Sequence, residues 1–300
     1  MAFSDLLQAF FQPVSRWNHR RLHALARKRL AARKRRLLEF GEHVVGLVVH
    51  TGQGDFVVNP SDNGVSRRLM QKGAYGLEEL ELAGAYLTPQ SECLVVGSHI
   101  GAIVVPLSKR CDQMQVIEAS PENFRYLRLN LRLNACDNVE AHNLAANDRG
   151  GEIEFLLSED NSGGSKRLPK ISGDGYYYDR PRVVKVAACT IDEVVGSRQL
   201  DLLFMDIEGS EYYALKGAQR TLALTKTLIV EFVPHHLSHV AGVSAADFWA
   251  QLAPHFNRLD VPRNHTVFEG RDRILIELER MAGALENHDN LVFSKSAGPA

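Results

Sequence analysis

The chain has 300 residues and a formal net charge of −1, and 45% of its residues are hydrophobic and 24% charged. These values are typical of a soluble globular protein with one large α/β domain and extensions, or with two small domains. No apolar run approaches the roughly 18 residues that cross a bilayer, so the sequence argues against a membrane-spanning protein.

The near-zero net charge hides a basic N-terminal segment. Residues 1–40 hold ten Arg or Lys but only two acids, which gives them +8 and leaves −9 for the other 260 residues. Apolar residues recur at helical spacing on both sides of Pro13, so we predict a basic amphipathic helical arm that is broken or kinked at this proline. Such an arm either docks on the protein's own body or on a second subunit, or lies at an anionic membrane surface.

The cysteines and the N-terminal residues indicate the cellular compartment of the protein. Cys93, Cys111, Cys136 and Cys189 show no CxxC spacing and have apolar neighbours, which predicts buried, reduced thiols rather than disulfides or metal ligands. The apolar stretch 6–14 is interrupted by glutamines and precedes the positive charge, unlike a secretory signal. We therefore expect a cytoplasmic protein, with the arm as its candidate for peripheral membrane contact.

Residues 41–90 are predicted to form a β-hairpin followed by helices. Val-rich residues 43–50 and residues 55–59 flank a Thr-Gly-Gln-Gly turn. Residues 66–87 have a helical pattern that is interrupted near Gly73 and Gly76.

From residue 92 onward, short apolar strands alternate with helices. Strands that are apolar throughout are buried on both faces, so the alternation predicts a parallel sheet covered by helices. The polar, Gly/Ser/Tyr-rich segment 158–180 is expected to be a lid, a substrate-reading loop or plain surface. We predict strands at 93–96, 115–118, 139–142, 152–157, 183–187, 202–205, 228–232, 256–261 and 290–293, and helices at 100–109, 121–133, 191–195, 211–222 and 244–252.

Two features of this alternation indicate a nucleoside-binding site. Gly97 and Gly101 belong to a turn directly between a strand and a helix, where the backbone can approach a ligand and present free N–H groups. Glu118 ends the next strand, 21 residues after Gly97. A carboxylate there can accept hydrogen bonds from both hydroxyls of a ribose, as found in S-adenosyl-L-methionine (SAM) and in NAD. The alternative is an exposed acid at a strand end.

The run from Leu202 to Glu211 places three acids at the carboxyl end of an apolar strand, where open α/β sheets bind ligands. Asp206 is predicted either to hold the positively charged methionine end of SAM or to orient an acceptor hydroxyl. Glu208 follows it in the same turn. Glu211 either joins the site or only caps the helix that follows.

These motifs resemble those of the FkbM family of SAM-dependent methyltransferases over about residues 75–295. Residues 118–134 look like the family's second motif, which has an acid, a Pro-containing turn, Asn-Phe and later Leu and Asn. Residues 206–218 resemble its Asp-x-Glu-Gly-x-Glu…Leu-x-Gly motif closely. Residues 228–231 and 290–293 also fit the family pattern.

The resemblance implies an α/β fold of the Rossmann-like class I methyltransferase type, with a mostly parallel seven-stranded sheet and a final antiparallel strand. It also implies SAM as the cofactor and, usually, an O-methyl product. The chain is accordingly divided into the arm (1–40), an N-terminal hairpin with helices (41–90) and the methyltransferase domain (91–295). The residues that the resemblance places at the cofactor are Gly97, Ser98, His99, Gly101, Glu118, Ala119, Asn143, Leu144, Ala145, Asp206 and Glu208, with Asp206 beside the transferred methyl.

The glycine motif departs from the family pattern. It usually begins with an acid, where this chain has Val95, and His99 stands where Asn is common. The departure leaves a non-catalytic scaffold with the SAM fold as an alternative to an enzyme. An NAD-dependent oxidoreductase is a second alternative, although the third glycine of the dinucleotide motif is missing.

Histidines follow the strand predicted before residue 233. His235 and His236 are predicted catalytic residues together with Asp206, because a histidine at the sheet edge can accept the proton of a hydroxyl near neutral pH. A structural role is the alternative. His235 and His239 also have metal-ligand spacing, with Glu231 or Asp206 as a third ligand, but we predict no metal site.

The predicted reaction is therefore the transfer of a methyl group from SAM to a hydroxyl of a small molecule, a glycan or a lipid. The sequence leaves the acceptor open among sugars, polyketides, peptides and lipids, and it leaves homo-oligomerisation open. A nucleic-acid partner is not expected, because the basic charge is confined to the arm and the body is acidic.

Overall fold

The computed structural model describes residues 38–41, 43–172 and 174–295, together with Lys28, Ala31 and Arg35. These three residues and residues 38–40 are helical and exposed. The rest of the predicted arm, including its break at Pro13, lies outside the described residues. In the described part of the chain, none of the helices combines the length and the apolar character that crossing a bilayer requires.

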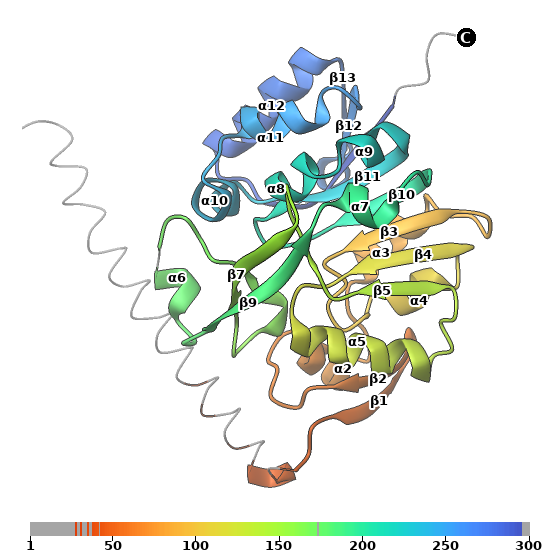
Figure 1. Ribbon diagram of the computed structural model, residues 1–300, viewed down its shortest axis with the longest axis vertical. Coiled ribbons are helices and arrows are strands. Elements are labelled where there is room, and N and C mark those ends of the chain that lie inside the picture. The colour runs from red at the N-terminus through yellow and green to blue at the C-terminus, as the bar shows by residue number, and fades with distance from the viewer. Residues whose placement is uncertain are drawn as a thin grey trace, which may run out of the picture.

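A mixed β-sheet forms the centre of the molecule (Figure 1). Five neighbouring strands run parallel, and the last strand in the sequence pairs antiparallel with one of them. The predicted fold class is therefore confirmed, although an edge strand that was not predicted, β13 (Thr266–Glu269), gives the described sheet eight strands instead of seven. The strand order is β13 (Thr266–Glu269), β12 (Arg258–Val261), β14 (His288–Ser294), β11 (Thr225–Phe232), β10 (Leu200–Met205), β3 (Glu92–Val96), β4 (Gln113–Ile117) and β5 (Val139–His142).

The strand order reverses beside β3, and this reversal fixes the place of a ligand site. β4 and β5 follow β3 on one side, whereas β10 lies next to β3 on the other side. A crevice opens between the carboxyl ends of the strands at such a reversal. Gly97 follows β3, Glu118 follows β4 and Asp206 follows β10, so all three candidate residues lie at this edge.

Helices cover both faces of the sheet. The predicted helices 121–133 and 191–195 are confirmed as α5 (Pro121–Leu133) and α7 (Ile191–Val195), and the side chains of Ser120 and Thr190 cap them. The other helices are α2 (Val65–Lys72), α3 (Leu77–Gly84), α4 (Val104–Ser108), α8 (Glu211–Lys216), α9 (Gln219–Leu224), α10 (Pro234–His236), the π-helical η2 (Leu237–Ala241), α11 (Ala245–Leu252), the short 3₁₀ helix η3 (Pro262–Asn264) and α12 (Arg271–Gly283).

Some predicted elements differ from the structure. The helix predicted at 100–109 begins only at Val104, because His99 and Gly101 adopt positive φ angles of 51° and 91° and continue the turn after β3. The helix predicted at 211–222 is divided into α8 and α9 at Gly217, where a Cβ atom would lie 2.0 Å from the backbone oxygen of Asn147. β13 and α12 were not predicted.

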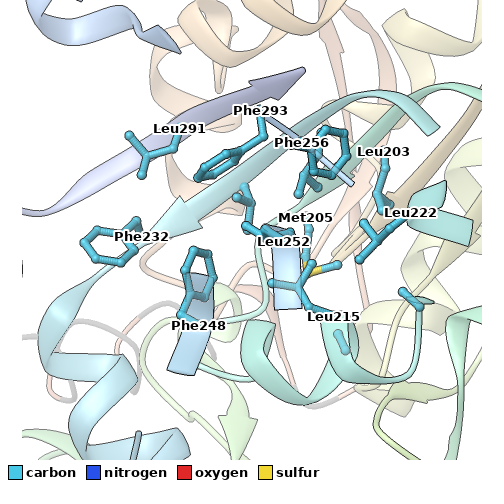
Figure 2. Packing of buried hydrophobic residues seen from close by; sticks show 14 of the residues in the cluster. Leu203, Met205, Leu215, Leu222, Phe232, Phe248, Leu252, Phe256, Leu291 and Phe293 are labelled. Atoms are coloured by element: carbon cyan, nitrogen blue, oxygen red, sulfur yellow. The ribbon is translucent and has the colours of Figure 1, made fainter. Parts of the chain in front are cut away.

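Alternate residues of the central strands point into two apolar cores, one on each face. In β3, Leu94 and Val96 join the first core, while Cys93 and Val95 join the second. Because both faces are covered, the strand is apolar throughout. Figure 2 shows the first core, where aromatic side chains of β11, β14 and α11 pack beside leucines of α8 and α9. All four cysteines are buried and free, as predicted.

A smaller sheet stands beside the main one. Its strand order is β6 (Ala145–Ala146), β9 (Arg182–Cys189), β7 (Gly151–Leu157) and β8 (Lys166–Arg167). Figure 1 shows the paired β7 and β9 extending away from the main sheet toward α6 (Asp174–Tyr177). The segment 158–180, predicted as a loop, contains α6, β8 and a short 3₁₀ helix, η1 (Ser162–Gly164).

The predicted N-terminal hairpin is confirmed as β1 (Leu47–Thr51) and β2 (Gly54–Val58). Asn130 of α5 and Asn134, which follows that helix, hold it. They exchange hydrogen bonds with the backbone of Val57 and Asp55 at 2.6–3.2 Å. Buried residues of β2, α2 and α3 join the same apolar core as β3 and β4. The boundary at residue 90 remains a prediction.

Candidate active site

Two adjoining cavities lie at the carboxyl ends of β3, β4 and β10. The first cavity contains about 540 Å³, including space open to solvent, and continues along the ends of β4 and β6. The second continues toward Tyr75, between α2 and α3. The residues that line both cavities are Gly97, His99, Gly163, Asp206 and Glu208.

The turn after β3 brings the ends of β3 and β10 together. Gly97 has a φ angle of 90°, and a Cβ atom there would lie 1.8 Å from the backbone oxygen of Asp206. Glycine is needed for so close an approach. The Asp206 N–H donates to the Val96 oxygen at 3.0 Å. These backbone contacts place the exposed Asp206 side chain where the two cavities meet.

Glu118 is buried at the end of β4, with 7% of its surface exposed. Its carboxylate accepts hydrogen bonds from the backbone N–H groups of His99 and Ser120, both at 2.8 Å. Burial raises the pKa of Glu118 to about 7, although these hydrogen bonds act in the opposite direction. Each carboxylate oxygen has two lone pairs, so the group retains capacity for two ligand hydroxyls.

Apolar side chains border the first cavity beside Glu118. They come from Ile117, Ala119, Leu144, Ala145 and Phe155. Apolar walls beside a few polar groups are typical of a site for a small organic ligand, and the walls next to Glu118 suit a purine base.

Most of the predicted cofactor residues meet at these cavities. Gly101 and Asn143 lie outside both linings. The Asn143 amide instead donates to the Glu118 backbone oxygen at 2.8 Å and supports the turn that carries the acid. Val95, which stands where the family usually has an acid, is buried and lines the second cavity. The predicted residues that do line a cavity are Gly97, Ser98, His99, Glu118, Ala119, Leu144, Ala145, Asp206 and Glu208.

The η1 segment covers the place where the cavities meet. His99 Nε2 lies 2.8 Å from the Ser162 hydroxyl, and the Asn123 amide donates to the Ser162 oxygen at 3.2 Å. The Ser162 N–H donates to Asp62 at 2.8 Å. Contacts from three separate parts of the chain therefore hold η1 in place beside the cavities.

Charged residues gather where β10 and β11 end and β8 approaches them. Lys166 Nζ lies 3.0 Å from Glu208 Oε2 and 3.4 Å from His236 Nε2. His236 Nδ1 lies 3.7 Å from carboxylate oxygens of Glu208 and Glu231.

Burial, reinforced by the charge of Lys166, lowers the pKa of His236 to about 3, so its ring is neutral near pH 7 and forms no ion pair with these acids. Burial, followed by the charge of Asp206, raises the pKa of Glu231 well above its usual value.

The two predicted catalytic histidines occupy different surroundings. His236 lies in the charged group with Lys166 and Glu208. His235 is exposed, and its Nδ1 atom lies 2.9 Å from that of His239. Neither histidine lines the two cavities. His236 therefore lies outside the cavity linings, beside Glu208 and Glu231.

Comparison with known proteins identifies the family. A sequence model of the methyltransferase FkbM domain matches residues 96–258, which is more than half of the chain. This chain belongs to the FkbM methyltransferase family. SAM, the cofactor expected from the sequence, is accordingly the cofactor of this family. A search of curated proteins gives no significant match.

Solved methyltransferases resemble this FkbM chain at low identity. An FkbM methyltransferase from Methylobacillus flagellatus is 17% identical, with a TM-score of 0.40 over 69% of this chain and 44% of that one. This chain thus spans less than half the length of that protein. A TehB-like SAM-dependent methyltransferase from Corynebacterium glutamicum is 15% identical, with a TM-score of 0.41 over 77% and 94% of the two chains. M. jannaschii TYW2, in complex with AdoMet, is 13% identical, with a TM-score of 0.35 over 64% of each chain.

The cavities suit the cofactor of an FkbM methyltransferase. The Glu118 carboxylate suits the ribose hydroxyls, and the apolar walls of the first cavity suit adenine. Gly97 lets the turn after β3 pack against the backbone of Asp206, and both residues border the two cavities. The carboxylates of Asp206 and Glu208 suit the positively charged end of SAM.

Sequence reasoning missed three side chains at this site. Lys166 is buried, and its Nζ lies 5.2 Å from the centre of the Tyr176 ring. Tyr75 lines the second cavity, and burial, followed by the charge of Asp206, raises its pKa to about 12. Lys166 and Tyr176 come from the segment predicted as a loop. Their polar neighbours in the sequence gave no signal that they would be brought to the end of β10.

Gly209 positions the charged residues, and its replacement gives a testable prediction. Gly209 has a φ angle of 100°, and a Cβ atom there would lie 2.9 Å from His236 Cβ and 2.7 Å from Val240 Cβ. We expect Gly209→Ala to destabilise the protein by about 2 kcal/mol or more, measured by urea unfolding, because both contacts involve rigid parts of a helix. Gly270→Ala is the control, since Gly270 has a φ angle of 90° but nothing within 4 Å of the new methyl. Equal losses for the two variants would refute the packing explanation.

Proposed function

We propose that this FkbM methyltransferase transfers a methyl group from SAM to a hydroxyl of a small molecule, a glycan or a lipid. SAM supplies, when bound, a methyl group on a positively charged sulfur that is already strongly electrophilic. The protein's task is then to position the acceptor oxygen, to exclude water and to receive the hydroxyl proton.

The observation that carries this proposal is the position of Asp206. Its side chain is exposed at the junction of the two cavities, whereas Glu118 lies in the first cavity alone. With the nucleoside placed against Glu118, Asp206 borders the remaining space beside the reactive end of SAM. An acceptor hydroxyl entering there meets a carboxylate that can orient its O–H group.

The contacts of His236 favour Asp206 as the group that receives the proton. Lys166 lies 3.4 Å from His236 Nε2 as a donor, so that nitrogen faces an ammonium group rather than the cavities. His235 is not proposed to receive the proton either, because its ring contacts His239 and lines neither cavity. In this proposal His236 is a positioning residue that packs beside Glu208 and Glu231.

The two carboxylates at the junction of the cavities, those of Asp206 and Glu208, support a hydroxyl acceptor. A hydroxyl must lose its proton as the methyl group arrives, so a base near the acceptor accelerates the transfer. A scaffold without activity would have no need of Asp206 and Glu208 at the junction of the cavities. The apolar Val95 in the second cavity is the observation that favours such a scaffold.

A product assay tests the proposed function. The full chain is incubated with SAM carrying a labelled methyl group and with separate pools of sugars, polyketides, hydroxy-peptides and lipids, and products are analysed by mass spectrometry. We expect the labelled methyl group in a product from one pool, bound to an oxygen atom. Reagents that react with amines should leave this label unchanged. Transfer only to nitrogen, carbon or sulfur would refute O-methylation, and binding of SAM without transfer to any pool would favour the scaffold.

A further inference from the structure

Three carboxylates converge at the ends of β10 and β11. Asp206 follows β10, Glu211 begins α8, and Glu231 lies near the end of β11. One oxygen atom from each of them lies within 4.8 Å of the others. Oxygen ligands around one divalent ion lie about 2.0–2.6 Å from it, and hence about 3–5 Å from one another. The spacing of the three carboxylates is therefore that of ligands around a single ion.

The Glu231 side chain gives a second and independent observation. Its surface is 11% exposed, and its Oε2 atom is fully buried without a hydrogen-bond partner among the described residues. The neighbouring His236 Nδ1 atom lies 3.7 Å away, beyond hydrogen-bond distance, and also lacks a partner there. A buried carboxylate oxygen without a partner is costly, so something is expected to satisfy it.

The lysine in this region is engaged by a different acid. Lys166 Nζ contacts Glu208 at 3.0 Å, and Glu208 does not belong to the set of three. Glu211 accepts a backbone hydrogen bond from Ile207 at 2.9 Å, which orients its carboxylate, and its two oxygens have lone pairs for a further partner. Asp206 is exposed and lines both cavities, so an ion from solvent has a path to the set.

We propose that Asp206, Glu211 and Glu231 form a binding site for one divalent cation. A donor set made only of carboxylate oxygens is typical of hard ions such as Mg²⁺, Mn²⁺ or Ca²⁺. Given the proposed function, the ion lies beside the acceptor hydroxyl, where it would hold the acceptor's oxygen in position. Binding of the ion itself does not depend on that function.

Mn²⁺ serves as the probe, because its binding is followed directly by the loss of the free-ion signal in electron paramagnetic resonance. The chelator-treated full chain is titrated with Mn²⁺, and we expect saturation at one ion per chain. Glu231→Gln keeps the shape of the side chain but replaces one carboxylate oxygen by an amide nitrogen that cannot bind a cation, and we expect it to weaken Mn²⁺ binding at least about tenfold. Asp206→Asn, at an exposed position, is expected to do the same without affecting the fold. Glu152→Gln on the exposed part of β7 is the control and should bind as the wild type does.

Two results would overturn the proposal. One is a wild-type chain that shows no saturable Mn²⁺ binding. The other is a folded Glu231→Gln or Asp206→Asn variant that binds Mn²⁺ as the wild type does. A titration with S-adenosylhomocysteine (SAH) on the same samples separates the two proposals. SAH binding without Mn²⁺ binding would refute the cation site but not the proposed methyl transfer. Mn²⁺ binding without methyl transfer would refute the proposed function but not the cation site.

Discussion

Replacing Asp206 by asparagine is expected to lower methyl-transfer turnover by at least about 100-fold while the protein stays folded. The side chain is exposed at the junction of the two cavities, so its loss leaves no hole in a core. The backbone contacts of Asp206 with Val96 and Gly97 are independent of the side chain and persist in the variant. The measurement is kcat with the acceptor found in the product assay, together with the thermal unfolding temperature.

A matched control for this variant is Asp260→Asn. Asp260 pairs with Arg258 on β12, away from the two cavities, and its loss should leave turnover unchanged. If the Asp206→Asn enzyme turned over at nearly the wild-type rate, Asp206 could not be the residue beside the transferred methyl. The placement of the reaction at the end of β10 would then be wrong.

Replacing Glu118 by alanine is expected to weaken SAH binding by about 100-fold or more, as measured by calorimetry. Two hydrogen bonds to a charged group contribute about 1.5–3 kcal/mol each, and the variant loses both of those to the ribose. Glu122→Gln is the control, because Glu122 lies four residues away on the exposed side of α5 and contacts Arg182. Unchanged SAH affinity in the Glu118 variant would refute the proposal that Glu118 binds the ribose.

The pKa of Glu118 adds a pH dependence to this prediction. Burial raises it to about 7 in the cofactor-free protein. Ribose hydroxyls donate to the ionised carboxylate, so binding favours the charged form and lowers this pKa. SAH affinity should therefore fall as the pH is lowered from about 8 to about 6, because a growing fraction of Glu118 must lose a proton before it binds. Glu118→Gln, which does not titrate, should bind weakly with a flat profile over the same range.

The sequence was sufficient to predict the parallel strands at the centre of the sheet, because each of them is a short run of apolar residues. Residues 93–96 and 202–205 are apolar throughout, and the structure shows why: their side chains alternate between two cores. The acids that follow such strands could be placed at one edge from topology alone. In this way Glu118 and Asp206 were predicted at neighbouring positions before any contact was known.

The turns and the segment 158–180 were harder to predict. The turn at His99 and Gly101 looked like the first turn of a helix, because its apolar residues follow helical spacing while its backbone does not. α12 was missed even though Ile274, Leu278 and Met281 recur on one face, a pattern that was available in the sequence. Lys166 is a different case, since its position depends on long-range pairing of β7 with β8.

This chain has Val95 where the family usually has an acid, and the surroundings of Val95 explain this difference in part. This side chain is buried in the second core and lines the cavity beside Tyr75. An acid at Val95 would stand near the Asp206 and Glu208 carboxylates, which border the same cavity. The chain thus retains negative charge in this cavity from β10 rather than from β3. On this view the methionine end of the cofactor relies on Asp206 and Glu208.

The most direct test of the account is a crystal structure of the chain with SAH. We predict that the ribose hydroxyls bind the Glu118 carboxylate, that the adenine lies between Ala119, Leu144 and Ala145, and that the sulfur lies on the side of Asp206. A complex in which SAH bound elsewhere, or in which the ribose pointed away from Glu118, would contradict it.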